Sequence, residues 1–186
     1  NNKIYLSVFF IFLFNIIGAV ALCFPSLREA ILKLAPFNLL LILCIFLYAN
    51  NDFSLSFLKT ILVVFIIGYF IEVLGVRFKF IFGEYYYGET LGLKILNTPL
   101  IMGVNWLTLS VSTFGIAAYI FKPKILIVIA ASVLMVLTDM LIEPISASLD
   151  FWHWKNSVIP TQNYIAWFLF SLIIHSIILK FDAKPN

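Results

Sequence analysis

The sequence predicts an all-helical, polytopic integral membrane protein, a bundle of about six transmembrane helices. Of its 186 residues, 63% are apolar and only 11% are charged, against roughly 45–50% and about 25% in soluble domains. Twelve basic and nine acidic side chains cannot cover a soluble domain of this size. Apolar runs such as residues 61–69 and 125–133 are continuous rather than alternating, which favours bilayer helices over membrane strands.

Proline, glycine, asparagine and charged residues delimit the expected spans. These are residues 4–24, 31–49, 57–76, 98–121, 124–147 and 162–180. The second span is the weakest, because Pro36 and Asn38 shorten its apolar part. Residues 77–97 are rich in Gly and Tyr and too polar to cross the bilayer, with a seventh, re-entrant or interfacial helix there as the alternative. Short connections predict a single transmembrane domain over residues 1–186.

The first span has a second interpretation. Lys3 is followed by an apolar stretch, residues 4–17, and then by Ala19-Val20-Ala21. This order is also typical of a cleavable signal peptide with a small-residue cleavage site. We favour a first span, because the remainder of the chain is equally apolar and a membrane helix explains the same residues.

Charge is distributed unevenly by sign. Six spans place both termini on one side of the membrane, and each side then carries six Lys or Arg residues, so the positive-inside rule does not orient the chain. Seven of the nine acidic residues belong to the side of the loops that follow spans one, three and five. We therefore expect the chemistry on that side.

Several classes of function are disfavoured. A net charge of +3 without a basic run predicts no nucleic-acid partner. Cys23 and Cys44 stand alone in apolar stretches, so neither a disulfide nor a metal site is expected.

Two acidic residues in the fifth span are the principal candidates for catalysis. Asp139 lies well inside the span, and Glu143 follows one helical turn later on the same face. A carboxyl inside a membrane helix is costly and usually functional, and two so close together cannot both ionise cheaply. One of them should keep its proton and serve as a general acid. The alternative is that Asp139 caps or bridges helices and that Glu143 lies at the membrane interface. Pro144 should bend the helix beside them.

Other polar side chains near the same side complete the candidate site. Glu72 closes the third span between Gly68 and Gly75, whose small size permits a close approach. Candidate substrate-binding residues occur in pairs: Asn105 and Trp106, Asn163 and Trp167, Trp152 and Trp154, Tyr85 and Tyr87. Interhelical hydrogen bonding and an aromatic belt are the alternative interpretations. His175 lies towards the opposite side, and we expect it to bridge helices.

A protonated acid among aromatic faces that attract cations is suited to protonating an alkene. Hydration or cyclisation of an isoprenoid by this route needs no cofactor. Several motifs follow in order: Glu72-Val-Leu-Gly75, Phe82-Gly83-Glu84-Tyr85-Tyr86-Tyr87 with Leu91-Gly92, Pro99-Leu100 before Asn105-Trp106, Asp139 with Glu143-Pro144, Asp150-Phe-Trp152-His-Trp154, and Pro160 with Gln162-Asn163-Tyr164 and Trp167.

Over residues 68–170, these motifs resemble the membrane carotenoid-biosynthesis family, which includes CruF-type carotenoid 1,2-hydratases and bisanhydrobacterioruberin hydratases. The chain departs from that pattern at Phe78-Lys79-Phe80-Ile81, where relatives have Thr-Gly and then Phe-Pro, and at Glu143, where many have Asp. The first departure bears on the choice of substrate.

The resemblance implies addition of water to the terminal double bond of an acyclic carotenoid. We expect Asp139 or Glu143 to protonate the alkene and the remaining carboxylate, or Glu72, to hold the water. It also implies a lipid-soluble carotenoid substrate, a bacterial inner membrane, contact with membrane lipids and contact with other enzymes of the pathway. The alternatives are a carotenoid cyclase that uses the same protonation, or a non-catalytic transporter or pigment-binding subunit.

Overall fold

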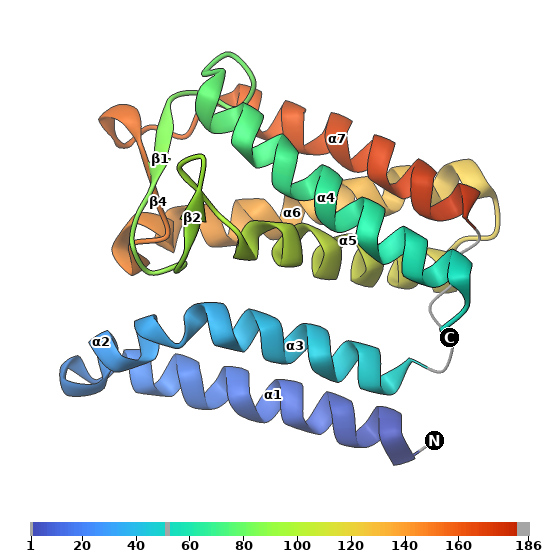
Figure 1. The fold of residues 1–186 in the computed structure, drawn as a ribbon, viewed down its shortest axis with the longest axis horizontal. Coiled ribbons are helices and arrows are strands. Elements are labelled where there is room, and N and C mark those ends of the chain that lie inside the picture. The colour runs from blue at the N-terminus through green and yellow to red at the C-terminus, as the bar shows by residue number, and fades with distance from the viewer. Residues whose placement is uncertain (1, 51–52, 182–186) are drawn as a thin grey trace.

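The computed structural model describes residues 2–50 and 53–181, and helices dominate it (Figure 1). The helices are α1 (Asn2–Leu22), α2 (Pro25–Lys33), α3 (Ala35–Ala49), α4 (Leu55–Arg77), α5 (Ile101–Ile120), α6 (Lys124–Ser146) and α7 (Thr161–Lys180). Five of these, all except α2 and α3, are long and apolar enough to cross a membrane. The predicted all-helical membrane bundle is thereby confirmed.

The second expected span is broken. Helices α2 and α3 meet at Leu34 with a bend of 57° and can be counted together as a sixth crossing. Pro36 lies in the first turn of α3, where its missing N–H costs nothing. The weakness seen in the sequence at Pro36 and Asn38 therefore coincides with a change of chain direction.

The segment between α4 and α5 does not contain the additional helix offered as an alternative. Residues 78–100 form turns and short strands: β1 (Tyr85–Tyr87), β2 (Lys94–Ile95) and β3 (Thr98–Pro99). Strand β2 pairs with β3, whereas β1 pairs across the molecule with β4 (Trp152–Trp154). Because Thr98 and Pro99 belong to β3, α5 begins only at Ile101, three residues after the expected limit.

Helices α4, α5, α6 and α7 form the main bundle, and the strands cover one end of it (Figure 1). Helices α1 and α3 lie alongside each other, and α3 packs against α5. Gly68 allows α4 to approach α5 closely, since a Cβ there would lie 2.3 Å from the Cβ of Trp106. Gly75 likewise leaves room for the ring of Phe82 to pack against α4. The sequence predicted such close approaches at these two small residues.

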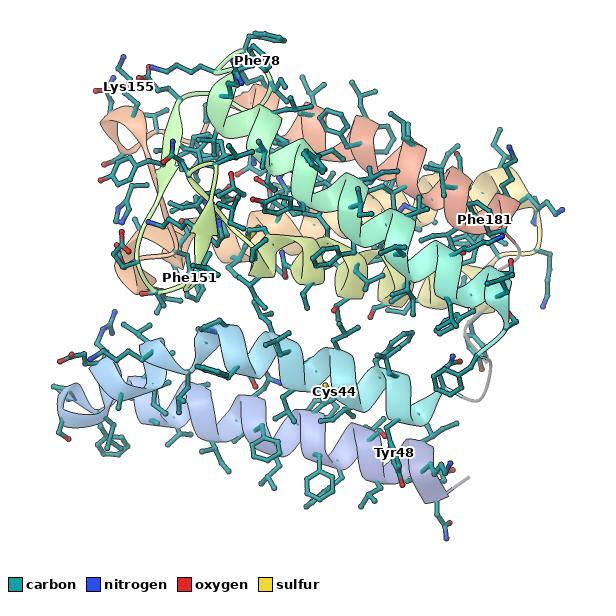
Figure 2. All side chains as sticks on the ribbon, in the orientation of Figure 1. Cys44, Tyr48, Phe78, Phe151, Lys155 and Phe181 are labelled. Atoms are coloured by element: carbon teal, nitrogen blue, oxygen red, sulfur yellow. The ribbon has the colours of Figure 1, made fainter. Side chains whose placement is uncertain are left out.

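Polar side chains are buried in the bundle, and large apolar ones cover its outer faces (Figure 2). Phe12, Phe37 and Leu141 are among the exposed apolar residues, which suits helices that face lipid. Short 3-10 turns, η1 (Ala147–Leu149) and η2 (Lys155–Ser157), flank β4 and return the chain to α7. The buried polar groups therefore need internal partners, because lipid supplies none.

Candidate active site

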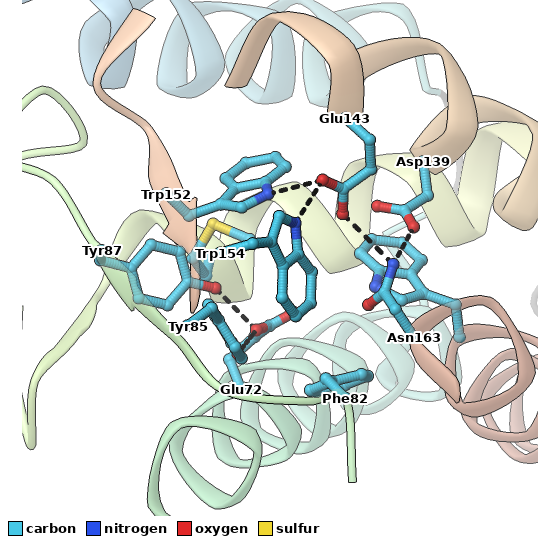
Figure 3. Close-up of a pocket in the computed structure, with 11 residues that line it drawn as sticks. Glu72, Phe82, Tyr85, Tyr87, Asp139, Glu143, Trp152, Trp154 and Asn163 are labelled. Carbon is cyan, nitrogen blue, oxygen red and sulfur yellow. Dashed lines mark hydrogen bonds between the residues drawn. The ribbon is translucent and has the colours of Figure 1, made fainter. Parts of the chain in front are cut away.

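Glu72 is buried near the end of α4, with 3% of its surface exposed. Its Oε1 accepts a hydrogen bond from Trp106 Nε1 at 2.7 Å. Its Oε2 accepts from the hydroxyls of Tyr85, at 2.8 Å, and Tyr87, at 2.6 Å. Three neutral donors from α5 and β1 thus surround this carboxyl. Figure 3 shows the two from β1, Tyr85 and Tyr87.

Asp139 and Glu143 project from the buried face of α6 with 2% and 4% of their surfaces exposed. That face also carries Ser132, Met135 and Ser146, which lie three to four residues, or multiples of a helical turn, from the two acids. Pro144 lies inside the helix and has no N–H to donate to the carbonyl one turn back. One helical face therefore delivers both acids to the same point.

Asn163 of α7 joins these two acids. Its Nδ2 donates to Asp139 Oδ2 at 2.7 Å and to Glu143 Oε1 at 3.2 Å (Figure 3). Glu143 Oε2 also accepts from the indole nitrogens of Trp152, at 3.0 Å, and Trp154, at 2.7 Å. In the described part of the chain, Asp139 accepts from Asn163 alone, whereas Glu143 has three donors.

The aromatic side chains reach the acids because β1 and β4 form an antiparallel pair. Tyr85 lies opposite Trp154, and Tyr87 opposite Trp152. Side chains alternate along a strand, so these four point inwards while Tyr86 and His153 stack against each other on the outer face, with ring centroids 5.0 Å apart. The strand pair thus forms an aromatic lid, residues 85–87 and 152–154, over the acids.

Ionic contacts hold the outer side of the aromatic lid. Glu84 accepts from Lys155, at 2.8 Å, and from Lys79, at 2.5 Å. These hydrogen bonds lower the pKa of Glu84 to about 2. Asp150 accepts from His153, at 2.7 Å, and this bond, which is the largest cause, lowers the pKa of Asp150 below its usual range.

The tyrosines that reach Glu72 are held as neutral phenols. Burial, and after it the negative charge of Glu72, raises the pKa of Tyr85 and of Tyr87 well above its ordinary value. Both hydroxyls therefore keep their protons and remain donors to Glu72. None of the ion pairs among the described residues involves Glu72, Asp139 or Glu143, so neutral donors alone meet their charge.

The three carboxyls share one small cavity (Figure 3). The cavity volume is about 20 Å³, which is room for about one water molecule. It is lined by Glu72, Phe82, Tyr85, Tyr87, Met102, Asp139, Glu143, Trp152, Trp154, Asn163 and Trp167. The structure therefore brings together all three predicted acids and six of the eight predicted substrate-binding residues.

The two remaining candidates, Trp106 and Asn105, are placed differently. Trp106 is fully buried behind the cavity, where it donates to Glu72 and stacks on Trp167 with ring centroids 4.3 Å apart. Asn105 is half-buried on α5 and does not line the cavity. A rotation of about 100° per helical residue separates neighbours, so Trp106 and Asn105 cannot face the same way.

Two lining residues were not among the candidates, Phe82 and Met102. Met102 precedes Trp106 by one helical turn, so the position of Trp106 would have pointed to it. Phe82 follows α4 in a turn and packs against Gly75, and no periodic signal in the sequence marks it.

His175 belongs to a separate polar cluster. Its Nε2 lies 3.1 Å from Thr113 Oγ1 on α5, and its Nδ1 lies 3.1 Å from Ser132 Oγ on α6. The expectation that His175 bridges helices is confirmed. Within residues 2–50 and 53–181, no group of three or more His, Cys, Asp or Glu side chains could hold a metal ion.

Comparison with known proteins identifies the family. A family model described as carotenoid biosynthesis protein matches residues 33–185, most of the chain. The chain belongs to this carotenoid biosynthesis protein family. No curated protein and no solved structure matches it. The match to the carotenoid biosynthesis family includes every residue of the cavity and reaches beyond the 68–170 of the sequence motifs, into α3. It leaves α1 outside.

Proposed function

We propose that this carotenoid biosynthesis protein hydrates the terminal double bond of an acyclic carotenoid to a tertiary alcohol. The observation that carries the proposal is the cavity itself. Three carboxyls without a basic partner face aromatic rings around a space that fits one water. Addition of water to an alkene is redox-neutral, so an acid, a base and a bound water suffice.

Asp139 is the proposed general acid. Hydrogen bonds from N–H and O–H groups favour the charged form of a carboxyl. Glu72 and Glu143 each have three such donors, whereas Asp139 has one, from Asn163. Asp139 is therefore the carboxyl best placed to hold a proton between two ionised neighbours.

The reaction then proceeds in two steps. The Asp139 O–H transfers its proton to the less substituted alkene carbon, and the π electrons form the new C–H bond. A tertiary cation remains, which the faces of Trp152 and Trp154 and the charge of Glu72 stabilise. Water adds to the cation and loses a proton to Glu143. Glu143 then returns this proton to Asp139. The two acids lie close enough for the side-chain amide of Asn163 to donate a hydrogen bond to both.

The small cavity favours hydration over cyclisation, because hydration requires the aromatic lid to admit less of the substrate. Ring closure requires several carbon atoms of the substrate to fold back inside the site, whereas hydration requires only the chain end and one water. A volume of about 20 Å³ holds the water but no hydrocarbon group. The alkene end therefore reaches Asp139 only when part of the aromatic lid moves aside.

The test is expression in a strain that accumulates lycopene, an acyclic carotene, followed by chromatography and mass spectrometry of the pigments. We expect a more polar pigment heavier by one water for each modified end. A new pigment with the mass of lycopene would contradict hydration and favour cyclisation as the reaction. An unchanged pigment profile, with the protein present in the membrane, would contradict an enzymatic function on this substrate.

A further inference from the structure

A second, much larger cavity lies next to the aromatic lid. It occupies the space between α1, α2 and α3 and has a volume of about 460 Å³, within the range of sites for small organic ligands. It is lined by Phe14, Asn15, Ile17, Gly18, Ala19, Leu22, Ile31, Leu32, Leu34, Ala35, Phe37, Asn38, Leu41 and Phe151. We refer to it as the apolar cleft. Among these lining residues none is charged.

Phe151 connects the apolar cleft to the carboxyl cavity. It lines the cleft, and the next residue, Trp152, lines the cavity and donates to Glu143. Phe151 also packs with Leu39 of α3 against the cluster that holds Trp152 and Met102. Figure 2 shows Phe151 on the side of the bundle that faces the helix pair α1 and α3. Two consecutive residues thus line the two spaces, Phe151 the cleft and Trp152 the cavity.

We infer that the apolar cleft holds the polyene chain of the carotenoid whose end is hydrated at Asp139, an inference that rests on the proposed function. The carboxyl cavity has no room for the hydrocarbon chain. Helices α1, α2 and α3 line the cleft, and in Figure 1 they lie below β4, with α2 towards the same end of the molecule. For one chain to occupy both spaces, the segment of Phe151 and Trp152, which lines both, has to shift.

The chemistry of the apolar cleft selects a rigid hydrocarbon. Inside a bilayer, lipid tails are as apolar as the cleft, so burial alone favours no occupant. A conjugated polyene has few free rotations to lose on binding, whereas a saturated acyl chain must be ordered at an entropic cost. The lining likewise has no charged side chain to pair with a phosphate head group, and its polar side chains are the amides of Asn15 and Asn38.

Arg28 links one wall of the cleft to the segment that carries Phe151. Its Nη2 donates to the carbonyl of Ser148 in η1 at 2.7 Å and so ties α2 to the turn that precedes β4. Helix α2 contributes Ile31 and Leu32 to the cleft.

Gly18 offers the test, because it lines the cleft and a Cβ there meets no atom within 4 Å. Gly18→Trp fills the cleft, and Gly18→Leu fills it partly. Ile16→Trp is the matched control, since Ile16 is 58% exposed on the opposite face of α1. The proteins are purified from lycopene-producing cells, and the polyene absorbance for each protein molecule and the hydrated product are measured.

We expect Gly18→Trp to reduce both bound lycopene and product by about tenfold, Gly18→Leu to reduce both less, and Ile16→Trp to match wild type. Product at the wild-type level with Gly18→Trp overturns the cleft and leaves the proposed hydration standing. If Gly18→Trp loses bound lycopene but neither the variants nor wild type form product, the result supports polyene binding in the cleft and overturns the proposed hydration. Purified wild type that carries phospholipid and no lycopene overturns the cleft.

Discussion

Replacing Asp139 by Asn separates chemistry from stability more cleanly than any other change at the acids. Asp139 is buried and accepts one hydrogen bond, from Asn163. The amide is nearly the same size and keeps one oxygen for that bond. We therefore expect a cost in folding free energy no larger than that of one neutral hydrogen bond, about 0.5–1.5 kcal/mol.

The catalytic effect of Asp139→Asn should be far larger. An amide cannot donate a proton to an alkene, and loss of a general acid costs typically about 10²–10⁴-fold in rate, or about 3–5 kcal/mol in barrier height. The assay is the initial rate of hydrated lycopene formed by membranes matched for protein content. Thermal unfolding of the purified variant in detergent provides the stability measurement.

Glu72→Gln is the contrasting variant. Three donors converge on the two oxygens of Glu72, so an amide nitrogen in place of either oxygen faces at least one of them. A buried donor left without an acceptor costs about 1–3 kcal/mol, and this variant should unfold at a lower temperature than Asp139→Asn.

Conversion of lycopene by Asp139→Asn at a rate within about threefold of wild type would refute the assignment of Asp139 as the general acid.

Three further predictions concern stability and the aromatic lid. Glu84→Gln should unfold at a lower temperature than wild type at neutral pH. The difference in unfolding temperature should vanish as pH falls from about 4.5 to about 2, because a carboxyl with a lowered pKa loses its stabilising charge in that window. A difference independent of pH would contradict this. Gly68→Ala should destabilise the bundle by about 1–3 kcal/mol, since its Cβ would collide with Trp106, whereas Gly18→Ala should be neutral; equal unfolding temperatures would exclude the close approach. His175→Leu should cost about 1–3 kcal/mol for two lost hydrogen bonds and leave the hydration rate of folded protein unchanged; a rate that falls tenfold at constant stability would assign His175 a part in catalysis.

Local periodicity accounts for what could be predicted about the acids. Asp139 and Glu143 are four residues apart on one helix, so their shared face depends on helical geometry alone. The same helical geometry puts Ser132 and Met135 on that face, and the structure buries both. Composition likewise identified the membrane, because too few charged side chains are present to cover the chain in water.

The pairing of β1 with β4 could not be predicted from the sequence. Tyr85–Tyr87 and Trp152–Trp154 are each three residues long and more than sixty positions apart. A strand of that length has no period that distinguishes it from an interfacial aromatic belt. The aromatic residues could be expected near the acids, where the structure places them. Neither their pairing nor the alternation that directs four of them inwards could be predicted.

Helix rotation explains the difference between Asn105 and Trp106. The two are neighbours in α5, and their residue types marked both as candidates. Which of them faces the carboxyls depends on how α5 packs against α4, and the contact of Gly68 with Trp106 decides it. Met102 joins the cavity for the same reason, one turn before Trp106.

The sequence by itself determined that the chain is a helical membrane protein and that Asp139 and Glu143 share one face of α6. Composition and helical period are local properties of the chain. Only the tertiary structure decided that Glu72 shares a cavity with those acids, that Asn163 joins Asp139 to Glu143, and that a larger apolar cleft lies beyond Trp152. These features depend on contacts between residues far apart in the chain, and such contacts exist only after the helices have packed.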